Sequence, residues 1–124
     1  KPSAVKTYIL GLKRIPDDER LSTELAKIYE DHHEYDKAIA LHEAVLAKNS
    51  GNKLAANNLA SILANYKHGE ADLKRAMELV AGFESSNNPV YLDTLGWVFY
   101  KKGNTKKEKQ KMQVRRKNIK VKML

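Results

Sequence analysis

The chain has 124 residues, no cysteine and a formal net charge of +8. Without cysteine it has no disulfide and no thiolate chemistry, and no run approaches the ~18 apolar residues of a membrane-spanning helix. Residues 106–124 contain nine Lys or Arg and one acid, which leaves 14 basic (23 − 9) and 14 acidic (15 − 1) side chains in residues 1–105. The whole excess of positive charge therefore belongs to a basic tail.

The first half of the chain is predicted to alternate helices and short turns. Residues 4–14 carry apolar side chains at helical spacing. Pro16 ends this helix, and the acidic residues that follow it suit the first turn of a second helix, which runs to about Asp31. Another helix begins at about Glu34 and ends before a turn of Asn, Ser and Gly at residues 49–52.

The second half continues the same pattern. Helices are predicted over residues 54–66, 73–83 and 90–101. Lys67, His68 and Gly69 break the first of these, and a loop of Ser and Asn precedes the last. Gly103 is predicted to end the last helix in a left-handed conformation.

Two series of residues recur at nearly constant intervals. Three leucines lie 34 and 36 residues apart, and three alanines lie 34 and 38 residues apart. Their members are Leu25, Leu59 and Leu95, and Ala4, Ala38 and Ala76. Self-similarity at this interval indicates an array of helical hairpins, which offers a binding surface more often than a catalytic site.

The pattern resembles the tetratricopeptide repeat (TPR), whose signature runs W-x2-L-G-x2-Y, then A-x3-F, then P. The matching residues in this chain are Ala4, Tyr8, Gly11, Pro16, Leu25, Ala26, Tyr29, Ala38, Leu59, Ala60, Ala76, Leu95, Gly96, Phe99 and Gly103. The resemblance covers residues 4–105 and implies an all-α fold, a right-handed superhelix of helical hairpins.

The resemblance also implies a division of the chain. Residues 1–16 form the second helix of a truncated repeat, residues 17–52 and 53–88 form two repeats, and residues 89–107 form the first helix of a further repeat. Residues 108–124 form the basic tail, as a frayed helix or a disordered segment.

Three positions depart from the TPR pattern. His42 stands where the family has an aromatic residue, and Glu108 and Arg115 stand where small residues are expected. The second helix of the last repeat is thus not encoded in the family pattern.

Residues 91–100 resemble large bacterial repeat proteins, some of them tied to exopolysaccharide export and envelope protein sorting. We interpret the chain as a fragment of a larger bacterial TPR protein, from the cytoplasm or the periplasm.

No motif supports catalysis. His32 and His33 share a turn with no histidine four residues away, so we expect no metal site. The serines lack a glycine-flanked elbow, and the glycines are too scattered for a phosphate-binding loop. We therefore expect no enzyme activity and no cofactor. His42 is expected to pack half-buried, with a ring nitrogen bonded to a turn carbonyl.

The resemblance implies that the first helix of each repeat lines a concave groove that binds a peptide or a partner helix. Asn side chains there can bond an extended backbone, and aromatic side chains can anchor an apolar one. Alternatively, Trp97 only covers the next helix and Tyr100 only packs at the repeat end. The candidate groove residues are Thr23, Lys27, Glu30, Asn57, Ser61, Asn65, Asp93, Trp97, Tyr100 and Lys101.

The partner implied by this interpretation is a protein or peptide, and the open repeat ends can also pair with a second copy of the chain. The alternative hypothesis assigns function to the basic tail. Its cations can bind nucleic acid or an anionic membrane electrostatically, although it has no aromatic residue for base stacking. A tail that is merely solvated is the simpler interpretation.

Overall fold

All regular secondary structure in the described part of the chain is helical. The computed structural model describes residues 2–104, so the predicted tail lies outside the described residues. A π-helical segment, η1 (Leu63–Lys67), follows α4, and a short 3₁₀ segment, η2 (Phe83–Ser85), follows α5. The helices are α1 (Pro2–Arg14), α2 (Glu19–Asp31), α3 (Tyr35–Lys48), α4 (Lys53–Ile62), α5 (Glu70–Val80) and an unlabelled helix over residues 89–104.

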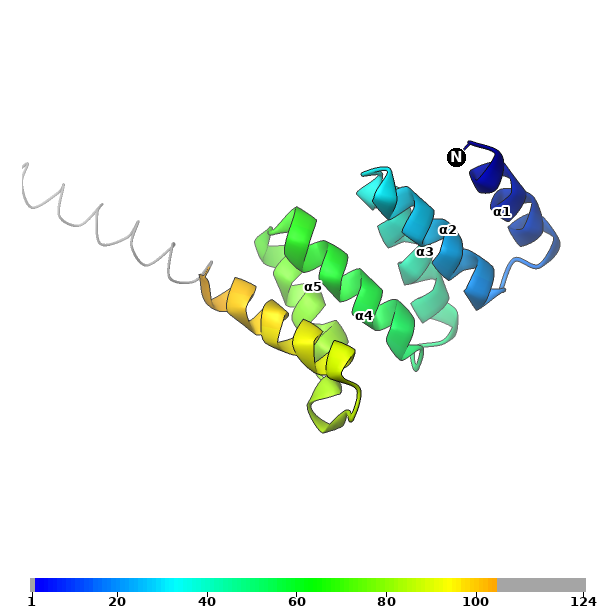
Figure 1. Cartoon of the computed structure of the whole chain (residues 1–124). Coiled ribbons are helices and arrows are strands. Elements are labelled where there is room, and N and C mark those ends of the chain that lie inside the picture. The colour runs from blue at the N-terminus through cyan, green and yellow to red at the C-terminus, as the bar shows by residue number, and fades with distance from the viewer. Residues whose placement is uncertain (1, 105–124) are drawn as a thin grey trace, which may run out of the picture.

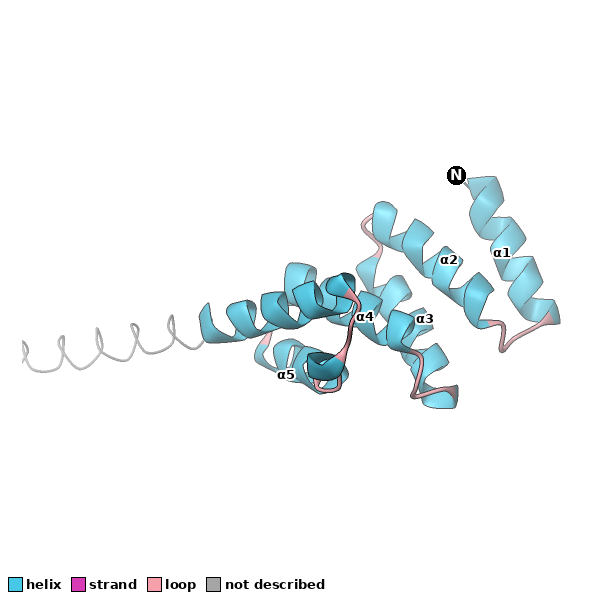
Figure 2. Cartoon of the chain, turned by 60° about the horizontal axis from the view of Figure 1, so that its bottom comes forward, coloured by secondary structure: helices cyan, strands magenta, loops and turns pink. Residues whose placement is uncertain are grey.

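The helices form an array in two layers (Figures 1 and 2). Successive helices from α1 to α5 pack on one another in chain order. In Figure 1, α2, α4 and the yellow-to-orange helix 89–104 run in the same direction in one layer, with α3 and α5 behind them. We call α2, α4 with η1, and helix 89–104 the first-helix layer. The described part is thus all-helical and repeat-like.

Each helix of this layer begins at a side-chain cap. Asp18 Oδ1 accepts a hydrogen bond from the Leu21 amide and Asn52 Oδ1 from the Ala55 amide, both at 3.0 Å. Asn88 Oδ1 accepts from the Val90 amide, the first N–H of helix 89–104, at 2.9 Å. Such caps satisfy amides that the first turn leaves unpaired. The three caps lie 34 and 36 residues apart, as the core leucines do, and this capping series is a signal that our sequence analysis missed.

Five of the six recurring residues lie in the core, and the sixth, Ala4, is half-buried. Leu25, Leu59 and Leu95 are all buried. The buried alanines allow helices to approach closely because they carry no side chain beyond Cβ. Four of them, Ala26, Ala38, Ala60 and Ala76, are completely buried.

Side chains also connect each hairpin to the next. Near the N-terminal ends of α2 and α4, Glu19 accepts hydrogen bonds from Asn49 and Asn52. Near the C-terminal ends of the same two helices, Tyr35 stacks on Tyr66 with ring centroids 4.0 Å apart. The remaining bonds of this kind join Lys48 to Asp17, Lys67 to Asp36, Arg75 to Glu43, and Trp97 to Asn65. The partners are 30 to 33 residues apart, close to one repeat.

The structure corrects the predicted helix of residues 54–66. Regular α-helix ends at Ile62, and η1 continues it, closing with a bond of 3.2 Å from the His68 amide to the Leu63 carbonyl. A π-turn accommodates one more residue than an α-turn. This wider turn places Tyr66 and Lys67 where they contact the preceding hairpin.

Other boundaries differ as well. α5 begins at Glu70, three residues before the predicted start, and ends at Val80. The prediction for Gly103 was wrong, because helix 89–104 continues through it and no glycine in residues 2–104 has a positive φ. The left-handed residues in this part are His33 (φ 62°) and His68 (φ 56°), at the turns that follow α2 and η1.

His42 is more deeply buried than predicted. It is only 2% exposed, and its Nδ1 has no hydrogen-bond partner in the described part of the chain. The predicted bond to a turn carbonyl is therefore absent there. Burial lowers the pKa of His42 from 6.5 to about 4, against a smaller opposing effect of the Glu43 charge. The ring is neutral in the folded protein at neutral pH.

Replacing Ala38 by Leu should destabilise the fold by about 1–3 kcal/mol, because the larger side chain does not fit between closely packed helices. Ala40→Leu, an exposed position on the same helix, should change the free energy of unfolding by no more than about 0.5 kcal/mol. Urea unfolding followed by circular dichroism measures both. Equal losses in the two variants would show that close packing at Ala38 is unimportant.

The stability of the native chain should fall between about pH 6.5 and pH 4. In this range the unfolded chain binds a proton at His42 that the folded chain excludes. The free energy of unfolding therefore decreases by about 2–3 kcal/mol as the pH drops. His42→Phe should remove this loss, and carboxylates titrate alike in both proteins. Urea midpoints at pH 7, 5.5 and 4 check this. A difference between variant and native that does not change with pH would contradict it.

Candidate functional site

The structure brings four of the predicted groove residues together. Trp97 Nε1 donates a hydrogen bond of 2.6 Å to Asn65 Oδ1 in the preceding repeat. The indole stacks on Tyr100, with centroids 5.5 Å apart and planes 20° apart. Lys101 Nζ lies 4.9 Å from the centroid of the Trp97 ring. We call Asn65, Trp97, Tyr100 and Lys101 the Trp97 cluster.

Positions along the helix explain this arrangement. Trp97, Tyr100 and Lys101 are spaced i, i+3 and i+4 on helix 89–104, so their side chains emerge on one side of it. Asn65 lies in η1 and reaches the indole from the neighbouring helix of the first-helix layer. Trp97 therefore contacts the preceding helix of this layer. The helix that the simpler interpretation expected it to cover would follow Gly103, and that part of the chain lies outside the described residues.

The Trp97 cluster nevertheless stays open to solvent. Trp97 is 41% exposed and Tyr100 is 61% exposed, even though hydrogen bonding, stacking and a cation–π contact hold the indole. An aromatic ring fixed before binding loses little conformational entropy when a ligand packs on it. Asn65 Nδ2 makes no hydrogen bond in the described part, so it can donate to a ligand. The cluster combines an apolar surface, a cation and an amide donor.

The predicted residues of α2 are arranged differently. The hydroxyl of Thr23 donates to the Glu19 carbonyl at 2.8 Å and so is engaged within its own helix. Lys27 is exposed and Glu30 is half-buried. Burial raises the pKa of Glu30, the neighbouring charge of Asp31 raises it further, and Lys27 opposes both effects.

Asn57 was expected on the groove surface, but it is buried. It is 5% exposed, and its amide nitrogen has only a long bond of 3.4 Å to Asn58 Oδ1. Its Oδ1 is buried without a partner in the described part. Asn57 therefore cannot offer donor and acceptor to a bound backbone in this conformation. Ser61 is half-buried and Asp93 is exposed, and neither joins the Trp97 cluster.

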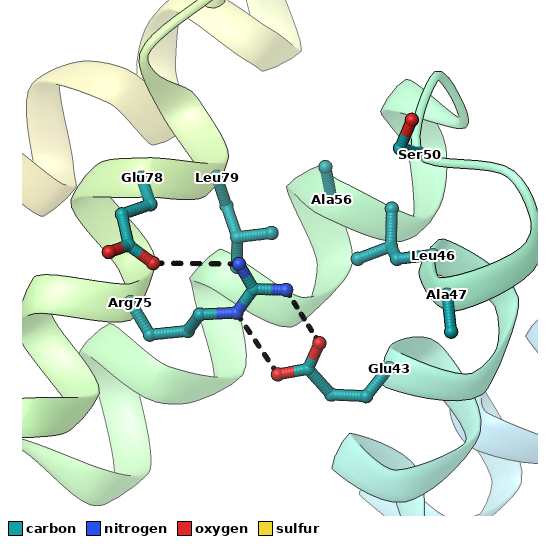
Figure 3. Close-up of a pocket in the computed structure, with 8 residues that line it drawn as sticks. All are labelled: Glu43, Leu46, Ala47, Ser50, Ala56, Arg75, Glu78 and Leu79. Carbon is teal, nitrogen blue, oxygen red and sulfur yellow. Dashed lines mark hydrogen bonds and ion pairs between the residues drawn. The ribbon is translucent and has the colours of Figure 1, made fainter.

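A cleft of about 380 Å³ that the sequence analysis missed lies between α3 and α5 (Figure 3). Arg75 Nε and Nη2 donate to the two oxygens of Glu43 at 3.1 and 2.6 Å, and Nη1 lies 3.6 Å from Glu78. Leu46 and Leu79 line the cleft beside these charges.

The ion pair of Arg75 and Glu43 connects α3 and α5, and we assign it a structural role. The hydrogen bond to Glu43 is the main cause that raises the pKa of Arg75; burial opposes it, and the Glu43 charge and then Glu78 add smaller increases. Because Arg75 and Glu43 are 38% and 41% exposed, solvent screens the pair, and its contribution to stability is about 1 kcal/mol or less. Opposite charges 32 residues apart, near the repeat interval, were the signal that could have predicted it.

The histidines form no obvious metal site. His33 Nδ1 lies 2.8 Å from the Tyr35 hydroxyl, in a shallow pocket of about 250 Å³ that Asp36 and Lys67 also line. Within residues 2–104, no group of three or more His, Asp or Glu is placed to hold a metal ion. In the same residues, none of the helices combines the length and apolar character needed to cross a membrane.

Comparisons with known proteins give no relative for this chain. No protein-family model matches it, and neither the curated proteins nor the solved structures contain a significant match.

Proposed function

We propose that the chain is a segment of a TPR superhelix and serves as a protein-interaction scaffold. Three series support the repeat: the core leucines, the buried alanines and the helix caps, of which the leucines and caps share intervals of 34 and 36 residues. In this proposal the first-helix layer lines the concave groove, which holds a peptide or partner helix.

The Trp97 cluster is the observation that carries the binding proposal. Exposed aromatic residues that are held rigidly are typical of binding hot spots. If Trp97 only covered the neighbouring helix, no stacking with Tyr100 would be needed. Tyr100 nevertheless stacks on the indole while more than half of it is exposed to solvent. The cluster supplies the anchor, and the polar residues around it supply adaptable contacts.

Peptides selected from a displayed random library against the whole chain should bind at the Trp97 cluster. Trp97→Ala should weaken their binding at least tenfold, about 1.4 kcal/mol, because the anchor surface is lost. Phe99→Ala is the matched control, since Phe99 is an exposed aromatic residue 200° around the same helix. Calorimetry measures affinity, and circular dichroism confirms that both variants keep their helicity.

Two results would contradict the groove proposal. One is a library that yields no binder of the native chain. The other is a set of binders whose affinity does not change in Trp97→Ala, which would place the binding surface elsewhere.

The location of the charge supports a second candidate function. All of the net charge of +8 lies in the last 19 residues, so electrostatic binding of nucleic acid or an anionic membrane would act through this segment. In this case binding to duplex DNA or to vesicles rich in phosphatidylserine should weaken steeply between 50 and 200 mM salt, by about a factor of ten or more. Binding that does not depend on salt in such a titration would rule this function out.

A further inference from the structure

One edge of the first-helix layer carries matching positions from three repeats. The last turn of α2, the π-turn η1 and residues 101–104 of helix 89–104 form this edge, which we call the turn edge (Figure 1). Asp31, Asn65 and Lys101 lie on it, 34 and 36 residues apart, as the core leucines do. The bond from Trp97 to Asn65 joins η1 to helix 89–104 beside this edge.

The α2 end of the turn edge is acidic. Glu30 and Asp31 form no ion pair in the described part of the chain, whereas four other carboxylates near turns, those of Asp17, Glu19, Glu34 and Asp36, are paired with Lys or Asn. The raised pKa of Glu30 shows that its carboxylate is partly desolvated. A carboxylate in this state gains more from a nearby cation than a fully solvated one.

The opposite end of the turn edge is apolar and cationic. Trp97 and Tyr100 expose their stacked rings there, and the Lys101 ammonium lies beside them. Lys101 has no carboxylate partner among the described residues. Between the two ends, Asn65 Nδ2 is an uncommitted donor.

We propose that the turn edge binds an extended segment of about seven residues with a defined order of side chains. A basic side chain lies at Glu30 and Asp31, and an apolar side chain followed by an acidic one lies at the Trp97 cluster. This proposal rests on the groove function above and names the partner's chemistry. The partner is a charged peptide segment of another protein.

The length follows from the spacing of helices. Packed helices lie about 10 Å apart, so the turn edge spans roughly 20 Å from α2 to helix 89–104. An extended chain rises about 3.3 Å per residue and covers this distance in about six steps. A helix would need roughly 13 residues. It would also bond its own carbonyls and leave Asn65 Nδ2 without an acceptor.

Trp97 provides a direct probe, because it is the only tryptophan of the chain. Peptides without Trp, in the order base, four-residue spacer, leucine, acid, would be titrated against the full chain in both chain directions. Charge-swapped peptides, with the acid first and the base last, serve as controls. At least one matched peptide should shift the Trp97 emission with about tenfold higher affinity than its swapped counterpart. The difference should shrink at 1 M salt, where the Debye length is about 3 Å.

A charge-reversed protein tests the assignment to residues. The double variant Asp31→Lys with Lys101→Glu should prefer the swapped peptides, because both ends of the turn edge change sign. The control double variant, Lys74→Glu with Glu84→Lys, makes the same charge changes at exposed positions on and after α5 and should keep the native preference. The tail is identical in all variants, so its attraction for acidic peptides cancels.

The outcomes separate this proposal from the groove function. If library peptides bind at Trp97 but matched and swapped peptides bind equally, the proposed charge order is wrong and the groove function stands. If the double variant keeps the native preference, the charges lie elsewhere on the surface. If the matched and swapped peptides leave the Trp97 emission unchanged while library peptides change it, this proposal fails and the groove function stands. If the library peptides also leave it unchanged, both fail.

Discussion

The fold depends on close contact between helices at positions that carry almost no side chain. Ala26, Ala38, Ala60 and Ala76 are completely buried, so neighbouring backbones approach to a distance that a larger residue would prevent. This approach lets Leu59 and Leu95 of the first-helix layer reach the same core as apolar residues of α3 and α5. The interval between the alanines then sets the interval between hairpins.

Polar and aromatic contacts fix how successive hairpins are aligned. The Arg75–Glu43 pair, the Tyr35–Tyr66 stack and the bonds of Glu19 lie at different sides of the array, and each joins residues about one repeat apart. Each contributes little alone, because most of these side chains are partly exposed. Together they restrict rotation and sliding of one hairpin against the next. Contacts between alanines alone would not do this, because their small side chains fit in more than one alignment. The bond between Trp97 and Asn65 belongs to the same set, so the candidate binding surface is also part of the alignment.

Two buried polar groups oppose stability. Neither Nδ1 of His42 nor Oδ1 of Asn57 has a hydrogen-bond partner in the described residues. A buried polar atom without a partner costs about 1–3 kcal/mol. The buried histidine makes the fold sensitive to acid, because a charged imidazole is far less tolerated in the core than a neutral one.

The sequence by itself determined the helical class, the repeat interval and the core, because burial on one side of a helix imposes a period that is visible in the residues. It also indicated Trp97, Tyr100 and Lys101 as one surface, since spacing within a helix places them together. Only the tertiary structure decided which side chains meet between hairpins. The π-turn at residues 63–67 and the burial of Asn57 depend on how neighbouring helices pack. The bond from Trp97 to Asn65 joins residues 32 positions apart, and no local pattern specifies which of the polar residues near that distance will be the partner.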